Sequence, residues 1–165
     1  DIPHKYIMRS GQLAFGTQIK GITKTLEKWK NIYKNADEYI YEILSEIPGD
    51  LFAPLTKKVK AGIKSRYIVS EFASVPQGRK AELKKSGFNK LIEKGLIERK
   101  MRKYVKVIIV LNEKEACVCF PNLNGEADLT EMFYGDDYQF HEWCLDYFKD
   151  CWSDADLFIE SKLKE

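Results

Sequence analysis

Residues 37–71, DEYIYEILSEIPGDLFAPLTKKVKAGIKSRYIVSE, decide the fold of the chain. Residues 38–45 form a short aromatic and β-branched run with little polar interruption, which is typical of a strand covered on both faces. Residues 48–50, Pro-Gly-Asp, then supply turn chemistry. The next apolar positions recur every four residues, which is the spacing of one helix face: Leu51, Leu55 and Val59. The stretch therefore predicts a strand, a turn and a helix.

A second strand follows this helix. Gly62 stands just after a lysine-rich stretch, which is a signal for the C-terminus of a helix. Residues 63–70 return to aromatic and β-branched side chains. Two strands joined by one helix form a right-handed βαβ unit with a parallel pair. We therefore predict such a unit here.

The pattern repeats weakly further along the chain. Residues 79–94 predict a helix that Gly87 weakens, and residues 96–101 predict a third strand. The segments VKAGIKSRYI and IEKGLIERKM share a glycine and an arginine four residues later. Residues 103–111 and 116–121, joined by a short polar turn, predict a β-hairpin. The predicted fold class is therefore α/β, with a βαβαβ-type mixed sheet and a C-terminal β-hairpin flanked by helices.

Helices are also expected before and after this unit. Residues 22–36 predict an amphipathic helix with Trp29 facing inward and lysines opposite. Residues 138–152 place aromatic and cysteine side chains on one helical face, and residues 154–163 are expected to continue as a frayed terminal helix. The expected organisation is one regulatory domain over residues 1–165, divided as follows: a connector with a short helical piece (1–21), the amphipathic helix (22–36), the α/β unit (37–111), the hairpin and loop (112–135) and the C-terminal helices (136–165).

Composition fits one globular core. The chain has 165 residues, of which 44% are hydrophobic, and no apolar run approaches the roughly 20 residues of a membrane span. It begins at Asp1 without an initiator Met or a signal peptide, so we expect a cytoplasmic piece of a longer protein with no membrane contact. The four cysteines show no metal or disulfide spacing and are expected to be reduced thiols: Cys117, Cys119, Cys144 and Cys151.

Charge is unevenly distributed along the chain. The formal charge is +4 over residues 1–78, +8 over residues 79–110 and −10 over residues 111–165. The basic middle block would suit nucleic acid. However, no stacking ladder, winged-helix spacing or zinc signature accompanies it. The other interpretation is that the basic block pairs with the acidic block, either within one molecule or between subunits.

Motifs that carry catalysis are missing. The sequence has no P-loop, G-x-G-x-x-G, G-x-S-x-G, H-E-x-x-H or paired C-x-x-C. Its two histidines are His4 and His141, and the His141–Cys144 spacing on a core helix favours packing over nucleophilic chemistry. We therefore expect no enzymatic activity, no metal and no cofactor.

A polar cluster is expected where the parallel strands end. Ligands of α/β sheets bind beyond the carboxyl ends of parallel strands. The polar residues at these ends, which we take as candidate ligand-binding residues, are Ser45, Glu46, Ser70, Glu71, Arg99 and Arg102. The alternative is that Glu46 and Glu71 pair with Arg99 or Arg102 as a satisfied sheet edge.

Four stretches together resemble one family: DIPHKYIMRSGQL, EYIYEILSEIP…VKAGIKSRYIVSE, KVIIVLNEKEACVCFPNLNGEADL and FHEWCLDYFKDCW. It is the middle, effector domain of archaeal helix-turn-helix regulators named after a methanogenesis regulatory protein. In that family a winged-helix DNA-binding domain precedes the effector domain, and this chain has none. The layout also resembles phospholipase D-like sensor domains of sugar-responsive archaeal regulators. Catalytic relatives of those domains use a His-x-Lys motif, which neither His4 nor His141 matches, so the resemblance implies a sensor without hydrolase activity.

The expected function is that of a ligand-sensing and dimerisation domain of an archaeal transcription regulator. Its partners would be an unknown small-molecule effector, a second copy in a homodimer, and DNA through the separate winged-helix domain. One alternative is a purely structural dimerisation module, whose interface would use Trp143, Tyr147 and Trp152 if these rings are exposed. Another is direct nucleic-acid binding through residues 79–106.

Overall fold

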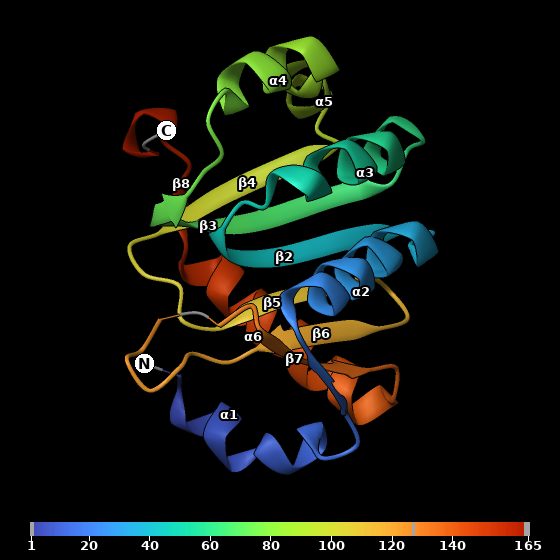
Figure 1. Cartoon of the computed structure of the whole chain (residues 1–165), viewed down its shortest axis with the longest axis vertical. Helices are drawn as coiled ribbons and strands as arrows, with labels where there is room; N and C mark the ends of the chain where they lie inside the picture. Colours follow the sequence, from blue (N-terminus) through green and yellow to red (C-terminus); the bar gives the residue numbers. More distant parts are fainter. Residues whose placement is uncertain (1, 127, 164–165) are drawn as a thin grey trace.

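An eight-stranded mixed sheet runs through the part of the chain that the computed structural model describes, residues 2–126 and 128–163 (Figure 1). The strand order is β1-β7-β6-β5-β2-β3-β4-β8. The strands are β1 (Thr17–Lys20), β2 (Tyr39–Glu46), β3 (Lys64–Ser74), β4 (Ile97–Arg102), β5 (Ile108–Leu111), β6 (Ala116–Cys119), β7 (Glu131–Gly135) and β8 (Asp156–Leu157). The α-helices are α1 (His4–Met8), α2 (Ile22–Asn35), α3 (Gly49–Lys60), α4 (Arg79–Ser86), α5 (Phe88–Glu93) and α6 (Tyr138–Asp154), and the 3₁₀ helices are η1 (Ser10–Leu13) and η2 (Glu160–Lys162).

The predicted βαβαβ unit is confirmed. Strand β2 pairs in parallel with β3, and β3 pairs in parallel with β4, with α3 and the α4–α5 pair as the crossovers. Helix α3 ends at Lys60. Gly62 follows two residues later with a φ of 102°, a conformation that glycine adopts freely and other residues adopt only with strain. The predicted helix 79–94 is divided in two by Gly87, which has a φ of 75° between α4 and α5.

The predicted hairpin is also confirmed, as β5 and β6 around the turn at residues 112–115. Two further strands, β7 and β1, extend this antiparallel half of the sheet and were not predicted. The prediction of a frayed helix over residues 154–163 is wrong. Beyond α6 the chain forms the short edge strand β8 and then η2, because Asp156 and Leu157 pair with β4.

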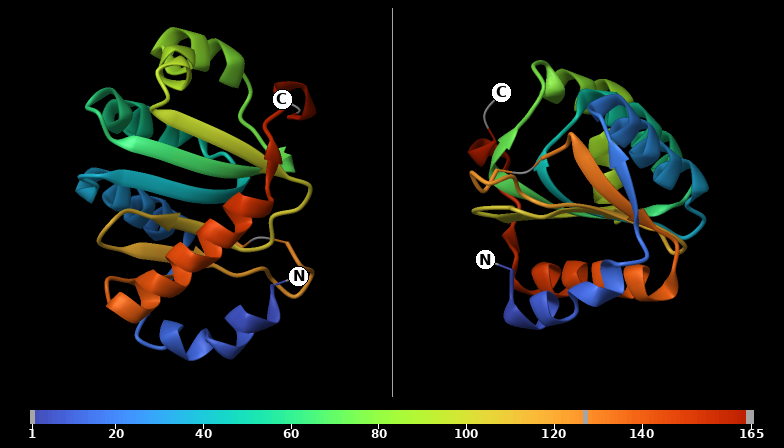
Figure 2. Two further views of the ribbon diagram at one scale, coloured as in Figure 1. Left: turned by 180° about the vertical axis from the view of Figure 1, so that it is seen from behind. Right: turned by 60° about the horizontal axis from the view of Figure 1, so that its bottom comes forward.

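Helices cover both faces of the sheet (Figure 2). Helices α2, α3, α4 and α5 lie on one face, over a core that includes Trp29, Val59 and Val69. Helices α1 and α6 lie on the other, over a second core that includes Ile68 and Trp143. Helix α6 is the predicted aromatic helix, and the Asp137 carboxylate caps it by accepting a 2.9 Å hydrogen bond from the backbone N–H of Gln139.

Across the described residues, no helix combines the length and the apolar character that crossing a membrane requires.

Candidate functional site

The six polar residues expected at the strand ends do not converge on one site. Ser70 and Arg102 are paired in register and turn toward the α6 side, where the Arg102 guanidinium donates to the Cys151 sulfur at 3.0 Å. The Ser70 hydroxyl donates to the backbone carbonyl of Lys103 and accepts from the backbone N–H of Phe72. Ser45 is half-buried near the end of β2. A hollow of about 220 Å³, lined by Arg102 and also by Tyr104 and Lys106, lies on this side.

Glu71 and Arg99 bind the C-terminal segment instead. The Glu71 carboxylate forms an ion pair with Lys162. The Arg99 guanidinium pairs with Glu160 at 3.0 Å and lies over the ring of Phe158 at 3.9 Å. Glu46 is half-buried at the end of β2, and burial raises the pKa of its carboxyl. The expected cluster is thus divided between the two faces of the sheet.

The aromatic residues expected at an interface lie largely inside the chain. Trp143 and Tyr147 are 1% and 7% exposed, and their rings stack with centroids 5.4 Å apart. Both rings also contact the ring of Tyr6 edge-on, so α1 covers this face of α6. Trp152 is half-buried and stacks on Phe148. The exposed aromatic stripe that would favour an interface is not formed, because α1 and the sheet use these rings in the core.

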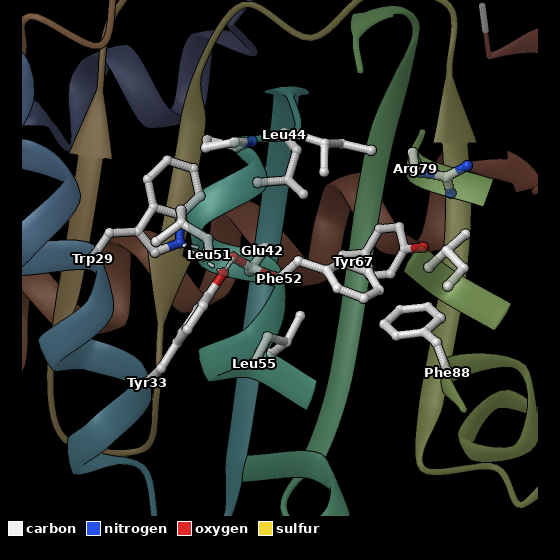
Figure 3. A pocket seen from close by; sticks show the side chains of 13 residues that line it. Trp29, Tyr33, Glu42, Leu44, Leu51, Phe52, Leu55, Tyr67, Arg79 and Phe88 are labelled. Carbon is white, nitrogen blue, oxygen red and sulfur yellow. Dashed lines mark hydrogen bonds between the residues drawn. The ribbon is translucent and has the colours of Figure 1, made fainter. Parts of the chain in front are cut away.

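A largely apolar pocket lies elsewhere, between the sheet and the helices of its α2–α5 face (Figure 3). Its apolar walls are formed by Leu44, Leu51, Phe52, Leu55, Leu83 and Phe88. Ile47 and Pro48, in the loop from β2 to α3, complete it. These loop residues follow the carboxyl end of β2, which is where ligands of parallel sheets bind. The pocket is a narrow one, with a cavity volume of about 40 Å³.

A buried carboxyl group stands at the α2 side of this pocket. Glu42 is 1% exposed, and its Oε1 atom accepts a 2.9 Å hydrogen bond from the Trp29 indole N–H. The Tyr33 hydroxyl donates to the same oxygen. Burial raises the pKa of Glu42 to about 7, although the two hydrogen bonds oppose the rise. At neutral pH the carboxyl is therefore far more often protonated than an exposed glutamate would be.

The secondary structure places these three side chains together. Trp29 and Tyr33 are four residues apart on α2 and share the face that packs on the sheet. Glu42 lies in the middle of β2, on the same side of the sheet as Ile40 and Leu44. Figure 3 shows the indole and the phenol of α2 converging on the strand carboxyl.

A buried cation stands on the opposite side. Arg79, the first residue of α4, is 5% exposed and pairs with Glu160. Burial acts to raise the pKa of Glu160, but the guanidinium groups of Arg79 and Arg99 hold this pKa below its usual value. Figure 3 shows Arg79 and Tyr67 beyond Phe52, away from Glu42. The pocket therefore lies between an acidic group and a cation that is already neutralised.

Sequence reasoning missed Trp29, Tyr33 and Glu42 as a site. One signal was available: Glu42 interrupts the apolar run from Tyr39 to Leu44, most of which is buried. A carboxyl in that position must find hydrogen-bond donors, and the α2 face that packs on the sheet carries an indole and a phenol.

Neither protein-family profiles nor curated proteins match this chain. Solved structures do match it in fold. One is TrmBL2, an archaeal chromatin protein whose structure "shows a novel mode of DNA binding", with a TM-score of 0.66 and 15% identity. That match covers 87% of this chain and 54% of TrmBL2, so this chain spans about half the length of that protein.

Two other matches cover 87% of this chain and 98% of theirs. They are NucT from Helicobacter pylori, with a TM-score of 0.64, and the phospholipase D family member Nuc from Salmonella typhimurium, with a TM-score of 0.62, each 12% identical. The fold is therefore phospholipase D-like, as the sequence predicted, and an archaeal chromatin protein shares it. The expectation that the chain is not an enzyme is contradicted, because nucleases of the phospholipase D family have this fold.

Proposed function

We propose that this chain is the effector-sensing domain of an archaeal transcription regulator, and that a small molecule binds between α2, α3 and the sheet. DNA would be contacted by a separate winged-helix domain of the longer protein. The single observation that carries the proposal is the apolar pocket at the ends of the parallel strands, with a buried carboxyl in its wall. Apolar walls with a few polar groups are the usual lining of a small-molecule site, but such sites are ordinarily larger, so a ligand has to widen this one.

Its position supports a sensing role. The pocket walls come from α2, α3, α4, α5 and the sheet, so a molecule that enters must shift these helices relative to one another. In a two-state sensor, the ligand stabilises the arrangement that it binds better. Helix α2 follows the N-terminal elements in sequence, and the resemblance places the DNA-binding domain before them. A shift of α2 could therefore be transmitted in that direction.

The homodimer expected from the sequence is part of the proposal. Since Trp143 and Tyr147 are buried within the chain, a second copy would have to use another surface. The purely structural alternative loses its aromatic interface for the same reason.

A thermal-shift screen of this chain tests the proposed pocket. The panel contains small apolar amines, alcohols, carboxylates, sugars and phosphates. A ligand at about 100 times its dissociation constant adds about 2.7 kcal/mol, which raises the melting temperature by about 5–10 °C in a domain of this size. Leu55→Trp, which fills the pocket, is expected to abolish the shift. Ala53→Trp adds the same side chain at an exposed position of the same helix and is the matched control.

If Leu55→Trp does not fold, Leu51→Phe provides a smaller obstruction of the same pocket. The proposal is refuted if no compound shifts the melting temperature, or if both pocket variants respond to the ligand as the Ala53→Trp control does.

A second candidate function is direct nucleic-acid contact through the helical layer. Helices α2 to α5 contain 12 Lys or Arg residues and four Asp or Glu residues, and they lie on one face of the sheet. The segment 79–106 that the sequence suggested overlaps this layer only through α4 and α5, and several of its other basic residues are engaged elsewhere. Arg79 and Arg99 pair with Glu160, Arg102 binds Cys151, and the Lys100 ammonium donates to the backbone carbonyl of Trp152.

A further inference from the structure

We propose that the pocket selects apolar amines, and that the protonated amino group of the ligand pairs with the carboxylate of Glu42. This inference rests on the proposed ligand-binding function and specifies the chemical class of the effector.

The first argument is the absence of a counter-ion. Among the described residues, the Glu42 carboxyl contacts the indole of Trp29 and the phenol of Tyr33, and neither carries a positive charge. Both donors bind Oε1. Buried carboxylates are ordinarily paired with a cation, and this one is 1% exposed. A ligand ammonium group would supply the missing charge.

The second argument is the character of the walls. Aromatic rings from four elements line the pocket: Trp29 and Tyr33 of α2, Phe52 of α3, Tyr67 of β3 and Phe88 of α5. The faces of such rings attract cations, most strongly where water is excluded. Apart from Glu42 and Arg79, the remaining lining is aliphatic, so the rest of the ligand has to be apolar. A short apolar body with one amino group satisfies both conditions.

Other ligand charges fit less well. A carboxylate or phosphate would be repelled by Glu42 whenever that group is ionised. The cation across the pocket, Arg79, could attract an anion, but Glu160 already pairs with it. A neutral alcohol could donate one hydrogen bond to Glu42 and would leave the charge of the carboxylate unbalanced.

The pocket borders another hollow near the β2–α3 and β3–α4 loops. A second hollow, lined by Gly49, Pro76, Gln77 and Gly78, adjoins the pocket and shares Ile47, Phe52 and Arg79 with it. Gly49 and Gly78 are both exposed at this point. A ligand would enter here, between the β2–α3 and β3–α4 loops, with its amino group leading toward Glu42.

The test uses matched probes that differ only in their polar group: isobutylamine, isobutanol and isobutyrate, and benzylamine, benzyl alcohol and benzoate. Their affinities for the full chain are measured by calorimetry at about pH 8, where most of Glu42 is ionised. In each series the amine is expected to bind about ten-fold or more tightly than the alcohol, and the carboxylate most weakly.

Glu42→Gln keeps the size of the side chain and an acceptor for Trp29 and Tyr33, and is expected to remove the preference for the amine over the alcohol. The control is Glu115→Gln, a buried glutamate that accepts from Asn35 and lies outside the pocket; it should retain the preference.

The amine assignment would be overturned if the unmodified chain bound amine and alcohol equally. It would also be overturned if the Glu42→Gln variant still preferred the amine. In either case the pocket would remain a ligand site. Failure of every probe and of the wider screen would overturn both the assignment and the proposed function. If Glu42→Gln does not fold, the difference in affinity between amine and alcohol in the unmodified chain still tests the amine assignment.

Discussion

At the scale of single residues, Glu42 makes the stability of the chain depend on pH. Its pKa is about 7 in the folded chain and 4.5 in the ordinary, exposed state. Between these values the folded chain retains a proton that the unfolded chain releases, so the free energy of unfolding falls as the pH rises. The contribution that is present at pH 4.5 and lost above pH 7 is on the order of 3 kcal/mol.

Glu42→Gln is expected to remove this dependence, since glutamine does not titrate. Urea unfolding at pH 5, 6, 7 and 8 should show the variant gaining stability relative to the unmodified chain as the pH rises. Glu38→Gln, at an exposed position next to the same strand, is the control. Parallel curves for Glu42→Gln and the unmodified chain would show that the carboxyl is not held in its protonated form by burial.

At the scale of elements, the C-terminal segment is held to the body of the chain by Glu160. Its two carboxylate oxygens bind Arg79 and Arg99, whose side chains are 4% and 20% exposed. Glu160→Gln would leave a buried cation without its charge partner. The expected loss is about 2 kcal/mol, between the values for exposed and buried pairs, measured as a lower midpoint of urea unfolding.

Glu98→Gln is the matched control for that variant. Glu98 pairs with Arg66 at 2.9 Å, but both side chains are more than a third exposed. Water screens this pair, and its loss should cost no more than about 1 kcal/mol. An equal effect of the two substitutions would mean that Glu160 does not hold the segment.

The elements that the sequence predicted well are those with a long, regular apolar pattern. Strands β2 and β3 and helices α2 and α6 belong to this group. Strands β1 and β8 are short and largely exposed, so they have no apolar run to identify them. They form because a neighbouring strand offers unpaired backbone groups, which is a tertiary effect.

The candidate site was less predictable than the fold. The sequence directed attention to the strand ends, but none of the six residues named there lines the pocket between the sheet and α2–α5. The face of the sheet could not be deduced, because alternation along β3 and β4 sends Ser70 and Arg102 to one side and Glu71 and Arg99 to the other. Trp29 and Tyr33, which line the pocket, come from α2, and the position of α2 over β2 depends on the whole topology.

At the scale of the whole molecule, charge is separated between the two helical layers. Helices α2 to α5 carry a net charge of +8, whereas α6 carries −3. The lysines Lys57, Lys60, Lys84 and Lys85 are all exposed on the basic layer. If this layer contacts DNA, the affinity should fall steeply as salt is added, because counterions are released on binding.

Reversing the charge of these four lysines to glutamate is expected to abolish binding to a DNA duplex at low salt. A milder change of all four to glutamine should flatten the slope of log affinity against log salt by about 3–4. Lys149→Glu, at an exposed position on α6, is the control and should leave binding unchanged. Absence of binding at low salt, or an equal effect of Lys149→Glu, would exclude the basic layer as a nucleic-acid surface.

The two outermost strands limit how this chain can assemble. Within the described residues, β1 has four residues and β8 has two, and each forms one margin of the sheet. So short a margin gives another polypeptide few backbone groups with which to continue the hydrogen-bonded ladder, and Lys20 adds a charge to one of them. These two short strands therefore offer other copies little backbone for edge-to-edge joining, which favours association through the side chains of helices and loops.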